Sequence, residues 1–206
     1  MTKVKICGVT NLEDALHACS LQADAIGFVF VRESPRYIDP IVAGKIIREL
    51  PPFVTSVGLF VNEKANVIQS IIDKVSLDVL QFHGDEAEEF CQRFNKKYIK
   101  AIQVKDSVNL IEYCDKYNSA SAILLDTYSE TSRGGTGELF DWKLIPADSP
   151  KPLIIAGGLN SKNVKQLLDF HNPYAVDVSG GVEQHKGKKD SHKMKEFILG
   201  VKNASL

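Results

Sequence analysis

The chain has few cysteines, and nothing in their spacing indicates that they act together. Its four cysteines lie far apart with no C-x-x-C pair, and its five histidines show no metal-ligand spacing. A disulfide framework and a zinc site both depend on closely spaced residues of these types. We therefore expect neither, and a reducing, cytoplasmic setting fits best.

Long apolar runs and a strong excess of one charge are also absent. No apolar run approaches the roughly 20 residues that span a bilayer, and the first residues lack the apolar core of a signal peptide. The net charge of −1 gives no reason to expect nucleic acid or an anionic membrane as a partner. Secretion and membrane insertion are not expected, whereas a small or anionic ligand remains open.

The chain does show a regular alternation of short apolar runs with longer segments of helical character. The predicted strands are residues 3–7, 25–30, 54–61, 78–84, 98–104, 122–126, 152–156 and 174–179. The predicted helices are residues 10 or 11 to about 21–23, 40–50, 62–75, 85 or 86 to about 95, 107–117, 140–145, 160–170 and 190–201. Residues 127–139 form the longest predicted loop.

Eight strand-then-helix units in 206 residues predict a compact, single-domain (β/α)8 (TIM) barrel over residues 1–206. The main alternative is an open doubly wound sheet, which usually has fewer strands and one main crevice. Polar or glycine residues end many of the strands here, as the loops at a barrel mouth require. They are Cys7, Gln81, His83, Asp126, Gly157, Gly158 and Ser179.

The first strand places a charged residue and a thiol on one face. Lys5 and Cys7 share that face because side chains alternate along a strand. If the face lines a closed barrel, Cys7 lies at the carboxyl end of the strand, where such barrels keep their chemistry. Strand eight closes the barrel beside strand one, and Asp177 has inward parity there. We therefore predict an interior ion pair between Lys5 and Asp177.

Seven short motifs match those of a known family in order and spacing. They are residues 5–10 (KICGVT), 30–36 (ending in SPR), 81–84 (QFHG), 125–126 (LD), 135–142 (GTG before FDW), 156–159 (AGGL) and 177–183 (DVSGGVE). With them, the whole chain resembles the phosphoribosylanthranilate isomerase family of tryptophan biosynthesis. One departure is visible, because the family more often has two serines after the strand-eight valine and Gly180 takes the second place here.

The resemblance implies an Amadori rearrangement of N-(5-phosphoribosyl)anthranilate to 1-(2-carboxyphenylamino)-1-deoxyribulose 5-phosphate. An acid must protonate the ring oxygen so that C1 becomes an iminium, and a base must then take the C2 proton. The resemblance gives Cys7 as the general base and Asp126 as the general acid. Such chemistry requires no metal and no cofactor.

Substrate binding is assigned to three parts of the predicted mouth. The phosphate is expected between the loops after strands seven and eight, where small residues let backbone N–H groups approach its oxygens. The residues assigned to it are Gly157, Gly158, Ser179, Gly180 and Gly181. Arg36 is expected to hold the anthranilate carboxylate as a bidentate partner, and Gln81 and His83 to line the mouth.

The two catalytic roles need protonation states that the free side chains do not favour at neutral pH. A cation at Lys5 would favour the thiolate of Cys7. Desolvation in a closed mouth, next to Leu124, would favour the protonated form of Asp126. Lys5 needs a partner of its own, which Asp177 would supply.

Each of these residues also has a plain structural interpretation. Without the motifs, Cys7 would be a small core residue, Asp126 a cap, Arg36 a solvated charge and His83 a satisfied turn residue. The Lys186 to Lys189 run is interpreted as a solvated turn. Three functions stay in view: the isomerase, another phosphate-binding barrel enzyme such as a sugar-phosphate epimerase, and an inactive barrel used for binding. Either a monomer or a homodimer is expected.

Overall fold

The protein is a closed parallel barrel. The computed structural model describes residues 1–104, 110–127, 142, 145 and 149–204. The strands are β1 (Lys3–Ile6), β2 (Ala25–Val29), β3 (Thr55–Phe60), β4 (Val79–Phe82), β5 (Lys97–Val104), β6 (Ala122–Thr127), β7 (Leu153–Ile155) and β8 (Ala175–Val178). Each pairs in parallel with the next, and β1 also pairs with β8. The predicted barrel is therefore confirmed, and the open sheet is excluded.

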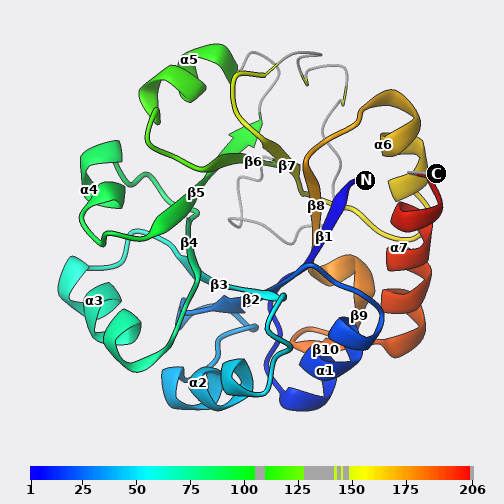
Figure 1. Ribbon diagram of the computed structural model, residues 1–206, viewed down its shortest axis with the longest axis horizontal. Helices are drawn as coiled ribbons and strands as arrows, with labels where there is room; N and C mark the ends of the chain where they lie inside the picture. The colour runs from blue at the N-terminus through cyan, green and yellow to red at the C-terminus, as the bar shows by residue number, and fades with distance from the viewer. Residues whose placement is uncertain (105–109, 128–141, 143–144, 146–148, 205–206) are drawn as a thin grey trace.

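The helices surround the ring of strands (Figure 1). They are α1 (Leu12–Ser20), α2 (Pro40–Arg48), α3 (Ala65–Lys74), α4 (Glu88–Gln92), α5 (Leu110–Lys116), α6 (Val164–Phe170) and α7 (Ser191–Ala204). Asn11 caps α1 by accepting a hydrogen bond from the backbone of Asp14, and Asp39 caps α2 in the same way. The side-chain oxygens of both caps satisfy helix N–H groups that otherwise have no partner.

Three predicted helices are several residues shorter than expected, and the first of them, α3, begins at Ala65 instead of residue 62. In α6 the residues after Asn160 form a turn first, in which its carbonyl accepts from Asn163 and Val164, so the helix begins at Val164. The acidic helix expected over 85–95 reduces to α4. The long loop expected over 127–139 and the short helix over 140–145 fall outside the described residues, apart from Thr127, Trp142 and Ile145.

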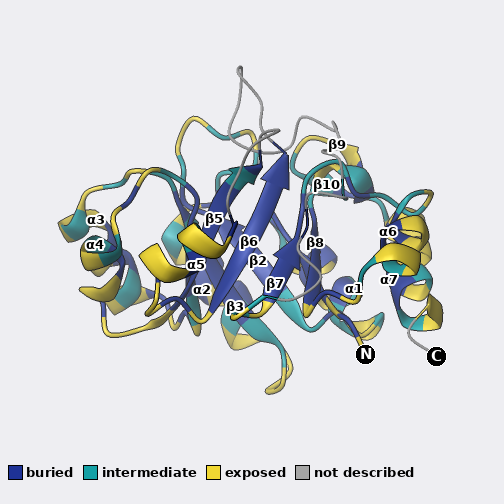
Figure 2. Cartoon of the chain, turned by 90° about the horizontal axis from the view of Figure 1, so that it is seen from above, coloured by how far each residue is buried: buried dark blue, intermediate teal, exposed yellow. Residues whose placement is uncertain are grey.

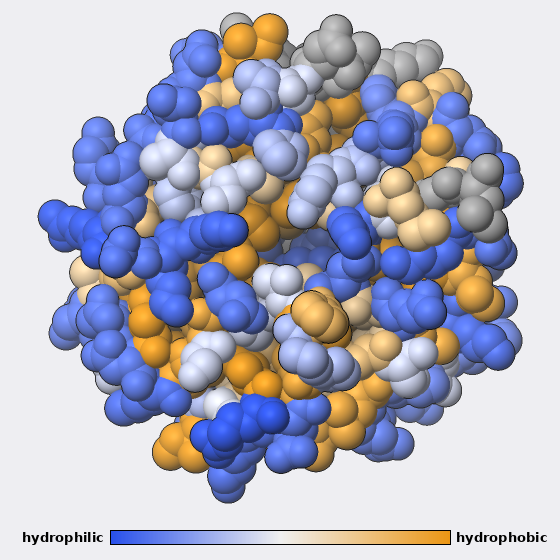
Figure 3. Space-filling view, viewed as in Figure 1, coloured by the Kyte–Doolittle hydropathy of each residue, from blue (hydrophilic) through white to orange (hydrophobic). Residues whose placement is uncertain are grey.

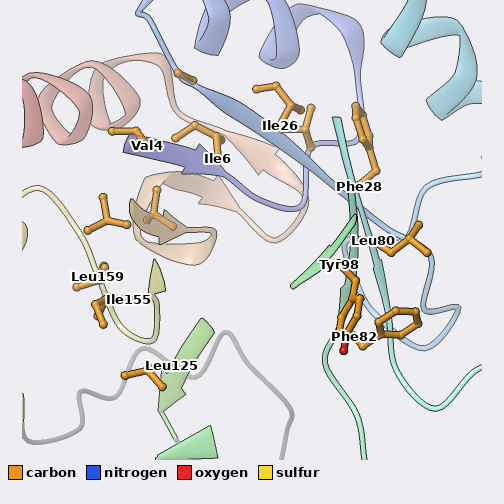
Figure 4. Packing of buried hydrophobic residues seen from close by; sticks show 14 of the residues in the cluster. Val4, Ile6, Ile26, Phe28, Leu80, Phe82, Tyr98, Leu125, Ile155 and Leu159 are labelled. Atoms are coloured by element: carbon orange, nitrogen blue, oxygen red, sulfur yellow. The ribbon is translucent and has the colours of Figure 1, made fainter. Parts of the chain in front are cut away.

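The core has two layers, separated by the sheet. The larger layer lies between strands and helices, and Figure 4 shows part of it, with Ile6 on β1, Phe28 on β2 and Leu125 on β6. The smaller layer fills the barrel from positions of opposite parity. Its buried members are Val57, Ile99, Ala101, Ala122, Leu124, Ile154, Ala156 and Ala175. Strands covered on both faces explain why their sequences are almost continuously apolar.

A small hairpin after β8 was not expected from the sequence. A short 3-10 turn, η2 (Gly180–Val182), leads into β9 (Glu183–His185), which pairs with β10 (Lys188–Lys189) in antiparallel fashion. The interpretation of this run as a solvated turn is wrong for Lys189, whose side chain is fully buried. Its charge is accommodated because its ammonium lies 3.0 Å from Glu183 Oε1.

The two ends of the barrel differ. In Figure 2 the β9–β10 hairpin lies at the end toward which the strands point, and both chain termini lie at the other end. The barrel strands β1–β8 are mostly buried in that view, while exposed positions concentrate on the outer helices and loops. Across the described ranges, no helix has the length and apolar character needed to cross a membrane.

Candidate active site

A cavity of about 760 Å³ opens at the carboxyl ends of the strands. Its lining includes all ten residues assigned to the site from the sequence: Cys7, Arg36, Gln81, His83, Asp126, Gly157, Gly158, Ser179, Gly180 and Gly181. They come from six different strand ends, so the fold brings together residues that are far apart in sequence. Figure 3 draws the opposite end of the barrel, the face seen in Figure 1, where hydrophilic residues dominate the outer surface and apolar residues lie among them.

The predicted ion pair inside the barrel is confirmed. Lys5 Nζ lies 2.9 Å from both carboxylate oxygens of Asp177, and the two residues are register partners across β1 and β8. Burial opposes the charge on Lys5, but the attraction of Asp177 and of Cys7 outweighs it, so the pKa of Lys5 is raised. The ammonium group is therefore a fixed positive charge beneath the cavity.

Cys7 follows β1 and is 6% exposed. Burial raises the pKa of its thiol, and the nearby cation of Lys5 lowers it by less. The expectation that Lys5 favours the thiolate is thus right in direction, but burial is the stronger effect. At neutral pH the resting side chain is a thiol.

Gly27, on the neighbouring strand β2, makes room for this pair. A Cβ atom built there would lie 2.8 Å from Cys7 Sγ and 3.1 Å from Lys5 Cε. Side chains at van der Waals contact need more than 3.4 Å. The sequence analysis did not single out Gly27, because its role becomes visible only when β1 and β2 are placed in register.

Asp126 ends a chain of hydrogen bonds that runs across three buried side chains. Its Oδ1 accepts from the backbone N–H of Thr127 at 2.9 Å, and its Oδ2 lies 3.0 Å from His83 Nε2. His83 Nδ1 in turn lies 3.0 Å from Gln81 Nε2. Gln81 and His83 therefore line the cavity as expected, and they also connect to Asp126.

The turn that carries His83 is fixed by a second buried ion pair. Lys100 lies 3.1 Å from Glu86 Oε2 and also donates to the carbonyl of Gly84 at 2.6 Å. Glu86 accepts from the backbone N–H groups of Gly84 and Asn62. Sequence reasoning missed this pair, because Lys100 sits in an apolar strand and Glu86 in an acidic run.

The loops after β7 and β8 approach each other closely through glycines. Gly157 and Gly158 have φ angles of +78° and +62°, which side-chain-bearing residues rarely adopt. A Cβ atom at Gly181 would collide with the carbonyl of Leu159 in the β7 loop. Only backbone fits between the two loops, and backbone N–H groups in such a place suit a phosphate.

Arg36 reaches the same end of the barrel and already has a carboxylate partner. Its Nε and Nη2 donate to the two oxygens of Glu183 at 2.7 and 2.8 Å. Glu183 also pairs with Lys189, so one carboxylate serves two cations. A guanidinium has a second bidentate edge, formed by Nη1 and Nη2, which can take another carboxylate.

Glu183 and Lys189 were not assigned to the site from the sequence. Glu183 closes the motif over 177–183, which was a usable signal. Burial opposes its charge, and its contacts with Arg36 and Lys189 outweigh that effect, so the pKa of Glu183 is lowered. Burial lowers the pKa of Lys189. Among the described residues, no group of three or more His, Cys, Asp or Glu side chains could hold a metal ion.

Comparison with known proteins gives a consistent result. Residues 4–199 match the family model described as N-(5'-phosphoribosyl)anthranilate (PRA) isomerase. The N-(5'-phosphoribosyl)anthranilate isomerase of Nitrosococcus oceani is 53% identical over 200 residues, which cover 97% of each chain.

Solved structures agree with the sequence comparison. A phosphoribosylanthranilate isomerase in complex with reduced 1-(o-carboxyphenylamino)-1-deoxyribulose 5-phosphate is 43% identical, with a TM-score of 0.88, over 98% of this chain and 100% of that one. Monomers generated from the dimeric enzyme of Thermotoga maritima are 42% identical, with a TM-score of 0.86, over the same shares of the two chains.

Proposed function

Because the chain belongs to the N-(5'-phosphoribosyl)anthranilate isomerase family, we propose that Cys7 and Asp126 are the general base and general acid of its reaction. The enzyme converts N-(5'-phosphoribosyl)anthranilate to 1-(2-carboxyphenylamino)-1-deoxyribulose 5-phosphate in tryptophan biosynthesis. The observation that carries the assignment is that both side chains, from opposite parts of the ring, line one cavity with the predicted binding residues.

The reaction begins with proton donation. Asp126, in its protonated form, gives its proton to the ring oxygen of the furanose, and the C1–O bond breaks as C1 becomes an iminium. The thiolate of Cys7 then removes the C2 proton, and the electron pair moves to form an enolamine. This tautomerises to the ketone. Acid and base act on different atoms of the sugar, which fits their places on β6 and β1.

Binding energy comes from both ends of the substrate. The backbone N–H groups around Gly157, Gly158, Ser179, Gly180 and Gly181 hold the phosphate. Arg36 holds the anthranilate carboxylate through the guanidinium edge that Glu183 leaves free. Glu183 orients the guanidinium, and Lys189 keeps Glu183 ionised. Gln81 and His83 form the wall beside Asp126.

Turnover of purified variants tests these roles. Cys7→Ala and Asp126→Asn should each remove nearly all turnover, measured as the loss of substrate fluorescence, while the melting temperature changes little. Single general acid or base groups contribute about 10² to 10⁴ in rate. Cys114→Ala is the matched control, because Cys114 is a buried cysteine of α5 outside the cavity. Near-normal turnover in Cys7→Ala or Asp126→Asn would sink the assignment, and an epimerase or an inactive barrel would then have to be considered.

We further propose a single domain, a small phosphorylated substrate and a cytoplasmic location for the enzyme. Residues 1–206 form one domain, supported by the closure of β1 against β8. The substrate is a small phosphorylated molecule, and the enzyme works as a monomer or homodimer, without nucleic acid or membrane partners. All four cysteines are free thiols, which supports a cytoplasmic location.

A further inference from the structure

Gln81 and His83 have a place in the structure that lining a cavity does not explain. They and Asp126 are 0%, 8% and 4% exposed, and their side chains form one line of hydrogen bonds, each 3.0 Å long. Such a line constrains where its hydrogens can be, because each contact needs one donor and one acceptor.

The charge of Asp126 decides which nitrogen of His83 carries hydrogen. Asp126 Oδ1 accepts from the backbone of Thr127, so the atom that gains or loses the proton is Oδ2, which faces His83 Nε2. An ionised Asp126 needs a hydrogen on Nε2. A protonated Asp126 needs a lone pair there, so neutral His83 must then carry its hydrogen on Nδ1.

Gln81 can pair with His83 in both cases. Its amide nitrogen faces Nδ1 in this structure, which requires a lone pair on Nδ1 and therefore hydrogen on Nε2. Rotation of the amide by a half-turn would present Oε1 instead and would match hydrogen on Nδ1. Within the part of the chain that the structure describes, Gln81 Oε1 is buried without a hydrogen-bond partner. The rotation therefore breaks no bond on that side.

We propose that Gln81 is a positioning residue that, by turning its amide, matches the tautomer of His83 to the protonation state of Asp126. This inference rests on the proposed acid role of Asp126. It explains how a buried carboxyl group stays hydrogen-bonded both before and after it donates a proton. A glutamate at position 81 could pair with only one tautomer of His83, and a leucine or methionine could pair with neither.

The protons balance over one turnover. When substrate binds, solvent supplies a proton to Oδ2, and the imidazole exchanges its hydrogen on Nε2 for one on Nδ1 with solvent. The Oδ2 hydroxyl then turns from His83 Nε2 to the ring oxygen of the substrate and gives up its proton there. Asp126 is left ionised, and the imidazole reverses its exchange with solvent. His83 gains no net proton.

The ¹⁵N chemical shifts of the His83 ring report the tautomer directly. The free wild-type enzyme should show hydrogen on Nε2, because the amide nitrogen of Gln81 faces Nδ1. In Asp126→Asn the amide oxygen should keep the Thr127 contact and the NH₂ group should face Nε2, which mimics protonated aspartate. His83 should then carry its hydrogen on Nδ1. The same tautomer in both proteins would overturn the proposal.

A second variant tests Gln81 itself. In Gln81→Glu a carboxylate faces Nδ1 and Asp126 faces Nε2, so both ring nitrogens should be protonated at neutral pH and Asp126 should stay ionised. We expect kcat to fall about ten- to a hundredfold and KM to change less than about twofold. Gln69→Glu, on the exposed surface of α3, is the control for the added charge.

The outcomes separate this proposal from the one on which it rests. A neutral His83 in folded Gln81→Glu would overturn the role of Gln81, and so would an unchanged kcat. If Gln81→Glu does not fold, Gln81→Met keeps most of the volume and lacks both hydrogen-bonding ends, and a lower kcat with unchanged KM is again expected. Normal turnover in Asp126→Asn would instead refute the acid role, whatever the tautomer of His83.

Discussion

Cys7, the proposed base, has surroundings that act on its pKa in opposite directions. Burial disfavours the thiolate, and Lys5, held in place by Asp177, favours it. The balance leaves the pKa of Cys7 raised, so only a small fraction of the side chain is in the nucleophilic, proton-accepting form at neutral pH. Cys7 can still act as a base in a site without water, as long as the Lys5 ammonium group stays close to its sulfur.

This balance can be measured by alkylation. The rate at which iodoacetamide modifies Cys7 follows the thiolate fraction, so it should still be rising above pH 9 instead of levelling off near the usual thiol pKa of about 8.5. Cys7→Ala supplies the background from the other three cysteines. A rate that levels off below pH 8.5 would mean that Lys5 outweighs burial.

At the scale of elements, the β9–β10 hairpin explains how Arg36 is aimed. Asp14 of α1 accepts from the backbone N–H of Lys189 and from the side chain of Lys188, both at 2.8 Å. The hairpin fixed in this way carries Glu183, and Glu183 holds Arg36. Helix α1, the hairpin and the loop after β2 therefore form one support for the proposed carboxylate site.

Substitutions along this support should affect binding more than the chemical step. Arg36→Ala should raise KM for the anthranilate substrate with little change in kcat, and Glu183→Gln should do the same by a smaller factor, because a neutral amide orients the guanidinium less firmly. Steady-state kinetics measures both. Glu13→Gln is the control, because Glu13 also contacts Lys188 but is 85% exposed. An unchanged KM in Arg36→Ala would argue against its carboxylate role.

The sequence predicted the starts of α1 and α2 well, because a helix start depends on residues within one turn of it. A cap-type residue, Thr10 or Asn11, and Pro40 in a first turn predicted these starts, because capping and proline preferences act within a few residues. The structure has Asn11 as the cap of α1. The hairpin was missed because Lys186 to Lys189 is a polar run when viewed alone. Burial of Lys189 depends on Glu183 and Asp14, and the contact with Asp14 spans 175 residues.

At the scale of the whole molecule, β1 and β8 close the barrel through an ion pair between Lys5 and Asp177 as well as through backbone hydrogen bonds. Side-chain parity was enough to predict that Lys5 and Asp177 meet, because parity is preserved around a closed ring of parallel strands. The positions of Cys7 and Asp126 at strand ends predicted that both lie at the mouth of the barrel, and the resemblance to the family supplied their expected roles. Parity could not show that burial outweighs Lys5 at the thiol, since that depends on how completely the residues pack.

Removing one partner of the closing pair should destabilise the protein strongly. Lys5→Met leaves Asp177 buried without its cation, and we expect the free energy of unfolding to fall by about 3–5 kcal/mol. Urea denaturation measures this change. Lys3→Met is the matched control, because Lys3 lies on the same strand and pairs with Asp24 while its side chain is 53% exposed, and its loss should cost about 0–1 kcal/mol. Equal effects of the two substitutions would contradict the structural role of the interior pair.

The pairing of β1 with β8 has a consequence for how the protein is made. Translation proceeds from the amino terminus, so Lys5 leaves the ribosome long before Asp177, which lies 172 residues later. Until that carboxylate emerges, the ammonium group has no counter-charge to accompany it into the interior and must stay in water. Strand β1, which is synthesised before the other seven, is therefore among the last of the eight to reach its final place. The nascent chain has to remain protected from aggregation at least until β8 has been synthesised.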